Sequence, residues 1–306
     1  MTTGKITIKS LPPFSFELSA NIFSHGDGQI RIYANGKFTQ LIRINSKLIH
    51  VTVESKGTVD KPKLQIYLKA NEKLTETEKK KASEAISSLF NLNLNVVQFY
   101  GDVKQDSTMT KITQKLWGLR IPTAQTVYEA LVDSIVEQQI SIKVAKALET
   151  KIIRKFGDTL HMDGEVYYEY PTPQAIANSP VEELRQCGLS QRKAEYIQEV
   201  SKLITDQKLD LEKFKNYSNA DQIIKEMDEI RGIGVWTAEL TMLRSMNIWD
   251  ALPADDFGIR RVISHYYCQD KKINSAQARE IAEAWGKWKG LAAFYLIVAE
   301  TLAIEV

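Results

Sequence analysis

The chain has 306 residues, which is long enough for about two or three domains with a large core. Its formal net charge is +2 and its sequence isoelectric point is near 8.3. Such a small net charge is not enough to bind a polyanion, so binding of this kind would need a local basic patch. Its two cysteines are too few for an iron–sulfur cluster with four cysteine ligands, and we expect both to be buried thiols.

The N-terminal third alternates apolar and polar residues in segments that are broken by Gly, Asn or Pro. This pattern predicts strand-like segments over 14–23, 28–45, 47–57 and 61–70. The next segment, 74–90, has apolar residues at helical spacing and predicts one amphipathic helix. Residues 1–103 are therefore expected to form a small α+β domain, and 104–118 to connect it to the rest of the chain.

A glycine-rich turn separates two apolar helical faces in the C-terminal half. The turn is Gly232-Ile233-Gly234, and the apolar residues of the two faces are Ile223, Ile224, Met227, Ile230, Leu240, Leu243 and Met246. Glycine at both positions permits a positive φ and leaves the amides at the start of the second helix open to an anion such as a phosphate. Glycine also ends many helices as a C-cap, so the turn alone does not decide between these roles.

An acidic pair, Asp255 and Asp256, follows Pro253 and precedes residues at helical spacing, which places the pair at a helix start. Aspartate is a favoured N-cap residue, and we assign the capping role to Asp255. The helix dipole stabilises an anionic carboxylate in the first turn, which suits a group that stands beside a developing cation. We assign that role to Asp256.

The segment from Gly232 to Ala238, followed by a proline and the acidic pair, resembles the helix-hairpin-helix (HhH-GPD) DNA glycosylases, and among them the AlkA-like 3-methyladenine glycosylases. Residues 128–157, 187–204 and 284–300 look like further helices of this family, so the resemblance covers roughly the C-terminal two-thirds. It implies an α+β domain with an antiparallel sheet, followed by a mainly α-helical glycosylase core. Residues 104–306 would then be an all-α region of two helical subdomains with the active-site cleft between them.

The resemblance also implies roles for individual residues. Asp256 falls on the family's catalytic aspartate, and Gln139 on the residue that fills the gap left by a flipped nucleotide, although Gln139 also fits a solvated position on a helix. The DNA-binding hairpin falls on Gly232, Gly234 and Thr237. The backbone carbonyls of Asp228, Ile230 and Ile233 fall on the family's site for a monovalent cation, and no other cofactor is expected.

A basic patch for DNA would draw on Arg260, together with Arg192, Lys193, Arg244 and Arg261. Each of these side chains taken singly also fits an ordinary solvated surface.

Trp236 stands where the bifunctional enzymes of this fold carry a lysine that attacks the sugar and forms a Schiff base. Tryptophan cannot form an imine, so we expect a monofunctional hydrolase without lyase activity. The resemblance places the base pocket at Trp236, Leu240, Ile297 and Val298. Aromatic residues are expected at the last three positions, so this pocket would offer fewer stacking faces, which puts the range of lesions in doubt.

The resemblance thus implies a base excision repair enzyme that flips out alkylated purines such as 3-methyladenine from double-stranded DNA. Asp256 would stabilise the oxocarbenium-like transition state or activate water. The alternatives are a glycosylase for deaminated or other damaged bases, such as hypoxanthine or uracil, and a non-catalytic DNA-binding protein, which would have no use for Asp256. No leader or membrane-spanning segment is evident, so we expect the protein to stay in the cytoplasm, without membrane partners. We also expect a monomer.

Overall fold

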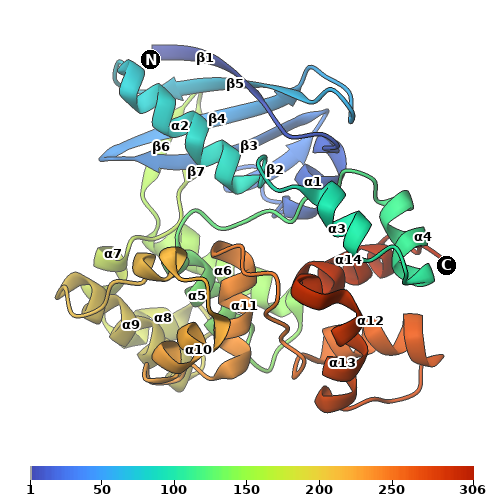
Figure 1. The fold of residues 1–306 in the computed structure, drawn as a ribbon. Helices are drawn as coiled ribbons and strands as arrows, with labels where there is room; N and C mark the ends of the chain where they lie inside the picture. The colour runs from blue at the N-terminus through green and yellow to red at the C-terminus, as the bar shows by residue number, and fades with distance from the viewer. Residues whose placement is uncertain (1) are drawn as a thin grey trace.

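The computed structural model describes residues 2–306 and has a sheet layer beside two groups of helices (Figure 1). The sheet has five antiparallel strands in the order β1-β5-β4-β3-β2. These strands are β1 (Thr2–Lys9), β2 (Arg31–Ala34), β3 (Lys37–Ile44), β4 (Lys47–Ser55) and β5 (Lys63–Ala70). The antiparallel-sheet domain is therefore confirmed, and β1 adds a strand that the sequence analysis did not predict.

Local sequence explains the sheet and the helix that covers it. Asn35 and Gly36 both have positive φ, 52° and 74°, and this conformation closes the tight turn that pairs Ala34 with Lys37. Helix α2 (Glu76–Leu89) lies across the sheet and begins with a capping box in which Thr75 and Glu78 exchange hydrogen bonds. The predicted helix over 74–90 is thus confirmed.

The segment predicted as a strand over 14–23 is instead helix α1 (Phe16–Phe23), so that prediction was wrong. Phe14, Phe16 and Leu18 alternate as in a strand, but the Ser15 hydroxyl accepts from the Leu18 amide and caps a helix. The buried residues of α1 are Phe16, Ser19 and Ala20, which lie three and four residues apart. Helical packing against the aromatic core of the sheet therefore overrides the local alternation.

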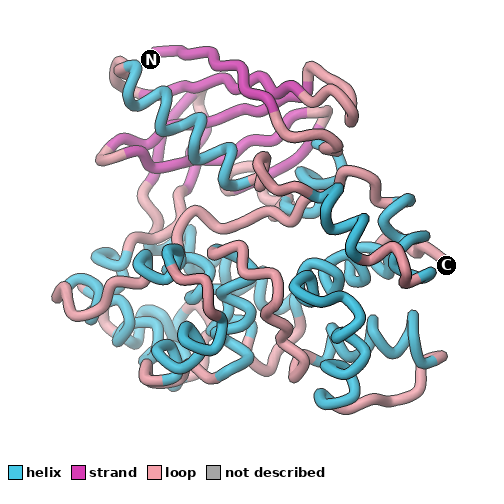
Figure 2. The backbone as a smooth tube through the Cα atoms, in the orientation of Figure 1, coloured by secondary structure: helices cyan, strands magenta, loops and turns pink. Residues whose placement is uncertain are grey.

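Two groups of helices form the rest of the chain, and Figure 2 shows them as the cyan segments away from the sheet. The first group comprises α5 (Val127–Glu137), α6 (Ile142–Phe156), α7 (Pro173–Ala177), α8 (Val181–Gln186), α9 (Gln191–Thr205), the 3₁₀ helix η1 (Glu212–Asn216), α10 (Ala220–Asp228) and α11 (Val235–Ser245). The second comprises α3 (Val96–Asp102), α4 (Ser107–Lys115), α12 (Phe257–Cys268), α13 (Ser275–Ala282), the 3₁₀ helix η2 (Glu283–Trp288) and α14 (Lys289–Thr301). The chain therefore visits the second group twice, before α5 and after α11.

The expected all-α character of residues 104–306 needs one correction, because a hairpin of β6 (Thr159–Met162) and β7 (Glu165–Tyr168) interrupts the helices. The hairpin lies beside the sheet domain in Figure 1. The Tyr168 amide donates to the Gln29 carbonyl at 2.8 Å, and Arg43 on β3 pairs with Glu169 at 2.8 Å. These contacts fasten the helical region to the sheet.

The two hydrophobic cores meet near residue 92. The sheet core ends at Leu92, whereas Phe99 and Val103 already belong to the helical core, so the expected boundary after residue 103 falls inside the second core. Arg120 lies fully buried where the layers join and donates to the carbonyls of Asn91, Leu94, Leu11 and Pro13. Burial lowers the pKa of this guanidinium to about 10.

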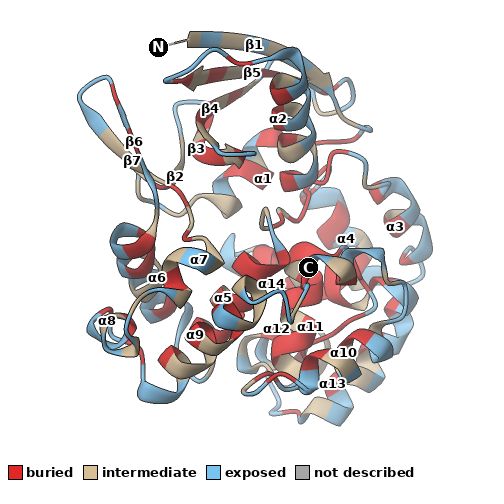
Figure 3. Cartoon of the chain, turned by 90° about the vertical axis from the view of Figure 1, so that its left-hand side faces the viewer, coloured by how far each residue is buried: buried red, intermediate tan, exposed pale blue. Residues whose placement is uncertain are grey.

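Buried residues line the inner faces of the helices, while the turn of the β6–β7 hairpin and many helix ends are exposed (Figure 3). Cys187 is buried as expected, but Cys268 is half-buried, and both are free thiols. Among the helices of residues 2–306, none combines the length and the apolar character needed to cross a bilayer.

Candidate active site

The glycine turn joins α10 to α11, and its two glycines have different roles. Gly232 has a φ of +86°, and a Cβ at this position would lie 2.3 Å from Cδ2 of Tyr196 on α9. Gly234 is the N-cap of α11 with a φ of −103°, and a Cβ there would meet open space. The expectation of a left-handed backbone therefore holds only for Gly232. Gly234 and Val235 are exposed, which leaves the start of α11 open to a ligand.

Asp256 is the N-cap of α12, so the capping role assigned to Asp255 was wrong. Oδ1 of Asp256 accepts from the Ile259 amide at 2.9 Å, and Oδ2 accepts from Nε1 of Trp236 at 3.3 Å. A carboxylate has two oxygens, so one group can cap the helix and also contact the indole across the α11–α12 junction. Asp255 is exposed and does not cap α12. The two donors fix the orientation of the Asp256 carboxylate.

The turn between α5 and α6 packs against the hairpin through a residue that the sequence analysis did not single out. Nε2 of Gln138 donates to the Gly232 carbonyl and to the Thr237 hydroxyl, both at 3.0 Å. Nζ of Lys193 on α9 donates to the Gln138 carbonyl at 2.6 Å and holds the same turn from the other side. The only sequence signal for Gln138 is its position beside Gln139.

These contacts leave Gln139 exposed at the tip of the turn, with a φ of 57°. It therefore lies in a turn and not on a helix, so the alternative of a solvated helical position does not apply. Thr237 is buried and its hydroxyl is occupied by Gln138, so its side chain does not reach the surface. Its predicted contact with DNA would have to use the backbone.

The residues expected in a base pocket lie on two helices. Trp236 and Leu240 on α11 are half-buried, one helical turn apart. On α14, Val298 is buried in the helical core and Ile297 packs against it. The assignment of these four residues to a pocket stays a prediction.

The starts of α6, α11 and α12 each carry exposed apolar side chains in the first turn. Contacts from Gln138 to the hairpin and from Trp236 to Asp256 bring the starts of α6, α11 and α12 together. The exposed residues are Ile142 (64%) and Val144 (47%) on α6, Val235 (43%) on α11 and Phe257 (74%) on α12. Exposed apolar groups beside open amides suit a ligand that has both phosphates and flat or sugar surfaces.

The basic residues named for a patch mostly have partners within the chain. Arg244 pairs with Glu137 at 2.8 Å, and Arg261 pairs with Glu300 at 2.6 Å. Arg260 donates to the Ala254 carbonyl at 3.1 Å beside the start of α12. Arg192 is exposed at the start of α9. Any contact that Arg244, Arg260 or Arg261 makes with a polyanion therefore has to be shared with, or exchanged for, its internal contact.

Comparisons with known proteins agree with this geometry. Residues 132–287 match the family model described as HhH-GPD superfamily base excision DNA repair protein, and residues 18–131 match that of the 8-oxoguanine DNA glycosylase N-terminal domain. A DNA-3-methyladenine glycosylase of Bacillus subtilis is 27% identical over 266 residues, covering 86% of both chains. A DNA-3-methyladenine glycosylase 2 of Escherichia coli is 26% identical over 60% of this chain and 61% of its own. Among solved structures, the 3-methyladenine DNA-glycosylase from Archaeoglobus fulgidus has a TM-score of 0.85 and 27% identity, covering 98% of this chain and all of its own.

Proposed function

Because the chain belongs to the HhH-GPD superfamily of base excision DNA repair proteins, we propose that it is a monofunctional DNA glycosylase that releases alkylated purines and leaves an abasic site. The observation that carries the proposal is the Asp256 carboxylate. It stands at the start of α12, oriented by the Ile259 amide and the Trp236 indole, beside the open N-terminus of α11. Relatives in Bacillus subtilis and Archaeoglobus fulgidus that bear the name 3-methyladenine glycosylase support this choice of substrate.

The mechanism follows from the bond that breaks. An N-alkylated purine carries a positive charge and leaves readily once the nucleotide has been flipped out of the duplex. The enzyme must then supply an anion near C1′ to stabilise the oxocarbenium-like transition state. Asp256 supplies that anion, and its fixed orientation lets the same carboxylate direct the attacking water. Loss of a preorganised group of this kind costs about a hundredfold in rate or more.

The absence of lyase activity follows from the residue at the start of α11. A Schiff base requires a primary amine near C1′, and Trp236 offers only an indole that donates to Asp256. Lys193 supports this view, because its ammonium group already donates to the carbonyls of Val136 and Gln138. The DNA strand should therefore remain unbroken at the abasic site.

Double-stranded DNA with a damaged base would lie across the three helix N-termini. The amides at Gly234 and Val235 would hold a phosphate, and the exposed Gln139 would enter the duplex. Carbonyls of Asp228, Ile230 and Ile233 would hold a monovalent cation behind the hairpin. The Ile230 carbonyl already accepts from the Ile233 amide at 3.0 Å, and its second lone pair suits such an ion.

The proposal is tested by incubating the wild-type protein with methylated double-stranded DNA. Released bases are identified by chromatography, and strand breaks are counted before and after alkaline cleavage of abasic sites. Release of methylated purines, with breaks only after alkali, is the expected result. Strand breaks without alkali, or a covalent protein–DNA adduct trapped by borohydride, would refute the monofunctional assignment, and no base release would refute the enzyme.

A further inference from the structure

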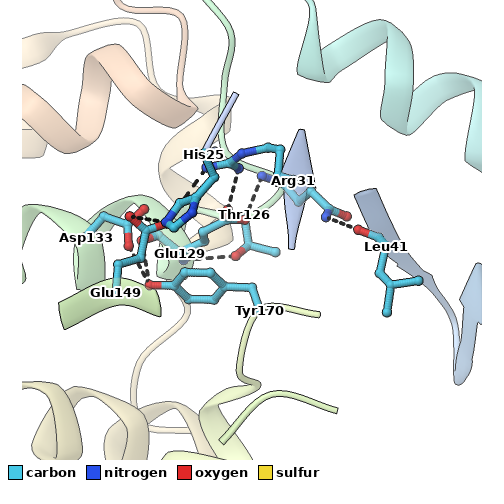
Figure 4. A network of polar contacts seen from close by, with 9 residues as sticks. His25, Arg31, Leu41, Thr126, Glu129, Asp133, Glu149 and Tyr170 are labelled. Carbon is cyan, nitrogen blue, oxygen red and sulfur yellow. Dashed lines mark hydrogen bonds and ion pairs between the residues drawn. The ribbon is translucent and has the colours of Figure 1, made fainter. Parts of the chain in front are cut away.

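A cavity of about 210 Å³ lies between the sheet domain and helices α5, α6 and α11. Its volume is many times the roughly 10–15 Å³ that one water needs, so it can hold a group larger than a single water molecule. Phe23 lines it with a ring that stacks on Phe38 and lies under the Arg31 guanidinium, and half of the lining residues are charged. The sheet domain contributes His25 and Arg31, which point toward the carboxylates of α5 and α6 in Figure 4.

All but one of the cavity's carboxylates lie within ion-pair distance of an arginine. Arg31 lies 3.7 Å from Glu129 and 3.8 Å from Glu149, and Arg244 pairs with Glu137 at 2.8 Å. Asp133 has a different environment. The Tyr170 hydroxyl donates to it at 2.7 Å, but in residues 2–306 no lysine, arginine or histidine forms an ion pair with it (Figure 4).

His25 also lines the cavity, and its polar side-chain atoms lack hydrogen-bond partners within residues 2–306. Its side chain is only 4% exposed, and Nε2 stands 3.6 Å from Glu149, too far for a hydrogen bond. Within the described chain, neither ring nitrogen has a hydrogen-bond partner. Buried polar groups are nearly always paired, so a ligand or solvent is expected to complete this side chain.

The charge of Asp133 is held in an unfavourable environment. Burial, followed by the charges of Glu149 and Glu129, raises the pKa of Asp133 well above its ordinary value. The titratable and charged groups around it are Glu129 and Glu137 on its own helix, Lys146 and Glu149 on α6, Arg244 on α11, Tyr170 after β7, and His25 and Arg31 from the sheet domain. A cation that entered the cavity would relieve this repulsion, whereas a neutral ring would not.

One face of α11 runs from the candidate active site to the cavity. On α11, Trp236, Leu240 and Arg244 follow one another at intervals of four residues, which places them along one face of the helix. This row begins at the contact with Asp256 and ends in the cavity wall. Glu137, also in the wall, directly precedes the turn that carries Gln139.

We propose that this cavity receives the extruded base and that Asp133 is a specificity-determining carboxylate, which selects a positively charged, alkylated purine over a neutral base. The inference rests on the proposed function and adds a second carboxylate to it. Asp256 acts on the sugar, whereas Asp133 acts on the base. A cationic base becomes the missing partner of Asp133, and a neutral base leaves that carboxylate unpaired.

The test measures single-turnover release of 3-methyladenine, a cation in DNA, and of hypoxanthine, a neutral lesion, by wild type and by Asp133→Asn. The variant should lower the ratio of the two rates about tenfold, because a charge-assisted hydrogen bond is replaced by a neutral one. Asp158→Asn is the matched control, because it removes the same charge from an exposed carboxylate that pairs with Arg43 outside the cavity. It should leave the ratio unchanged, and an unchanged ratio in Asp133→Asn would overturn the inference.

A second readout uses the wild type alone and does not depend on the folding of a variant. The preference for 3-methyladenine needs an ionised Asp133, so the ratio should rise with pH through the raised pKa of this group. A ratio that is flat with pH would refute the role of Asp133 even if the protein is an active glycosylase, whereas failure to release either base would refute the proposed function itself.

Discussion

Gly232→Ala should destabilise the protein and weaken its hold on DNA, whereas Gly234→Ala should leave the fold intact. At Gly232 the new Cβ would lie 2.3 Å from Cδ2 and 2.4 Å from Cγ of Tyr196, and the backbone has a φ of +86°. Arg231 lies over the Tyr196 ring, and the same guanidinium pairs with Glu195 and Glu199, so the ring cannot move without disturbing these contacts.

Two separate costs contribute to the expected effect. A left-handed backbone costs a residue with a Cβ about 1–2 kcal/mol, and forcing a methyl group into a packed site costs about 1–3 kcal/mol. Alanine also lowers the conformational entropy of the unfolded chain, which stabilises the folded state by about 0.4–1 kcal/mol and offsets part of these costs. We therefore expect Gly232→Ala to lower the free energy of unfolding by about 3 kcal/mol. Gly234→Ala should change it by about 1 kcal/mol at most, since its Cβ meets open space.

Urea denaturation of wild type and both variants measures this difference. The transition midpoint of Gly232→Ala should shift to lower urea while the slope stays unchanged. Fluorescence anisotropy with an abasic-site duplex gives the affinity for DNA in the same samples. Equal stability of Gly232→Ala and wild type would refute the account of the hairpin. An equal loss in Gly234→Ala would show that the space around the second glycine is not open.

Two further predictions concern the surface and the pH dependence. Phe257→Ser should change stability by no more than about 0.5 kcal/mol, because the ring is largely exposed, but it should weaken DNA binding several-fold if the three helix starts face the duplex. Val97→Ser, an exposed apolar residue on α3, is the control, and an equal effect of both on anisotropy titrations would contradict the assigned surface. Burial raises the pKa of Glu169 to about 7 despite its contact with Arg43. The stabilisation that the protonated Glu169 contributes is therefore fully present below its unfolded pKa and is lost as the pH rises through about 7. The free energy of unfolding of wild type, relative to that of Glu169→Gln, should fall by about 3 kcal/mol between about pH 5 and pH 8. Urea denaturation at both pH values checks this, and a difference that does not change with pH would refute it.

Sequence predicted the elements whose local signals and tertiary packing agree. The strands around Asn35 and Gly36 and the helix after Thr75 have turn and cap residues that specify them without help from the rest of the chain. Residues 14–23 gave the wrong answer because their alternation fits a strand, while the Ser15 cap and packing under the sheet favour a helix. The β6–β7 hairpin was missed because its two strands have only four residues each and gain their support from the sheet domain.

In the candidate site, the sequence located Asp256 and the hairpin, but the capping role was assigned to Asp255 and not to Asp256. Capping depends on where α12 begins, and a shift of one residue transfers the cap from Asp255 to Asp256. Gln138 could not be separated from Gln139 by sequence, because only the turn geometry points the first at Gly232 and the second at solvent. The cavity around Asp133 joins residues more than a hundred positions apart, which no local pattern can reveal.

The most direct test of the central claim compares single-turnover base release from methylated DNA by wild type, Asp256→Asn and Asp255→Asn. Asparagine caps helices as well as aspartate does, so Asp256→Asn should keep α12, while it removes the negative charge and the oxygen that accepts from the Trp236 indole. The account predicts that Asp256→Asn slows release about a hundredfold or more, while Asp255→Asn, which removes the charge of the exposed neighbour, retains nearly the wild-type rate. Release by Asp256→Asn at the wild-type rate, or an equal loss in both variants, would contradict it.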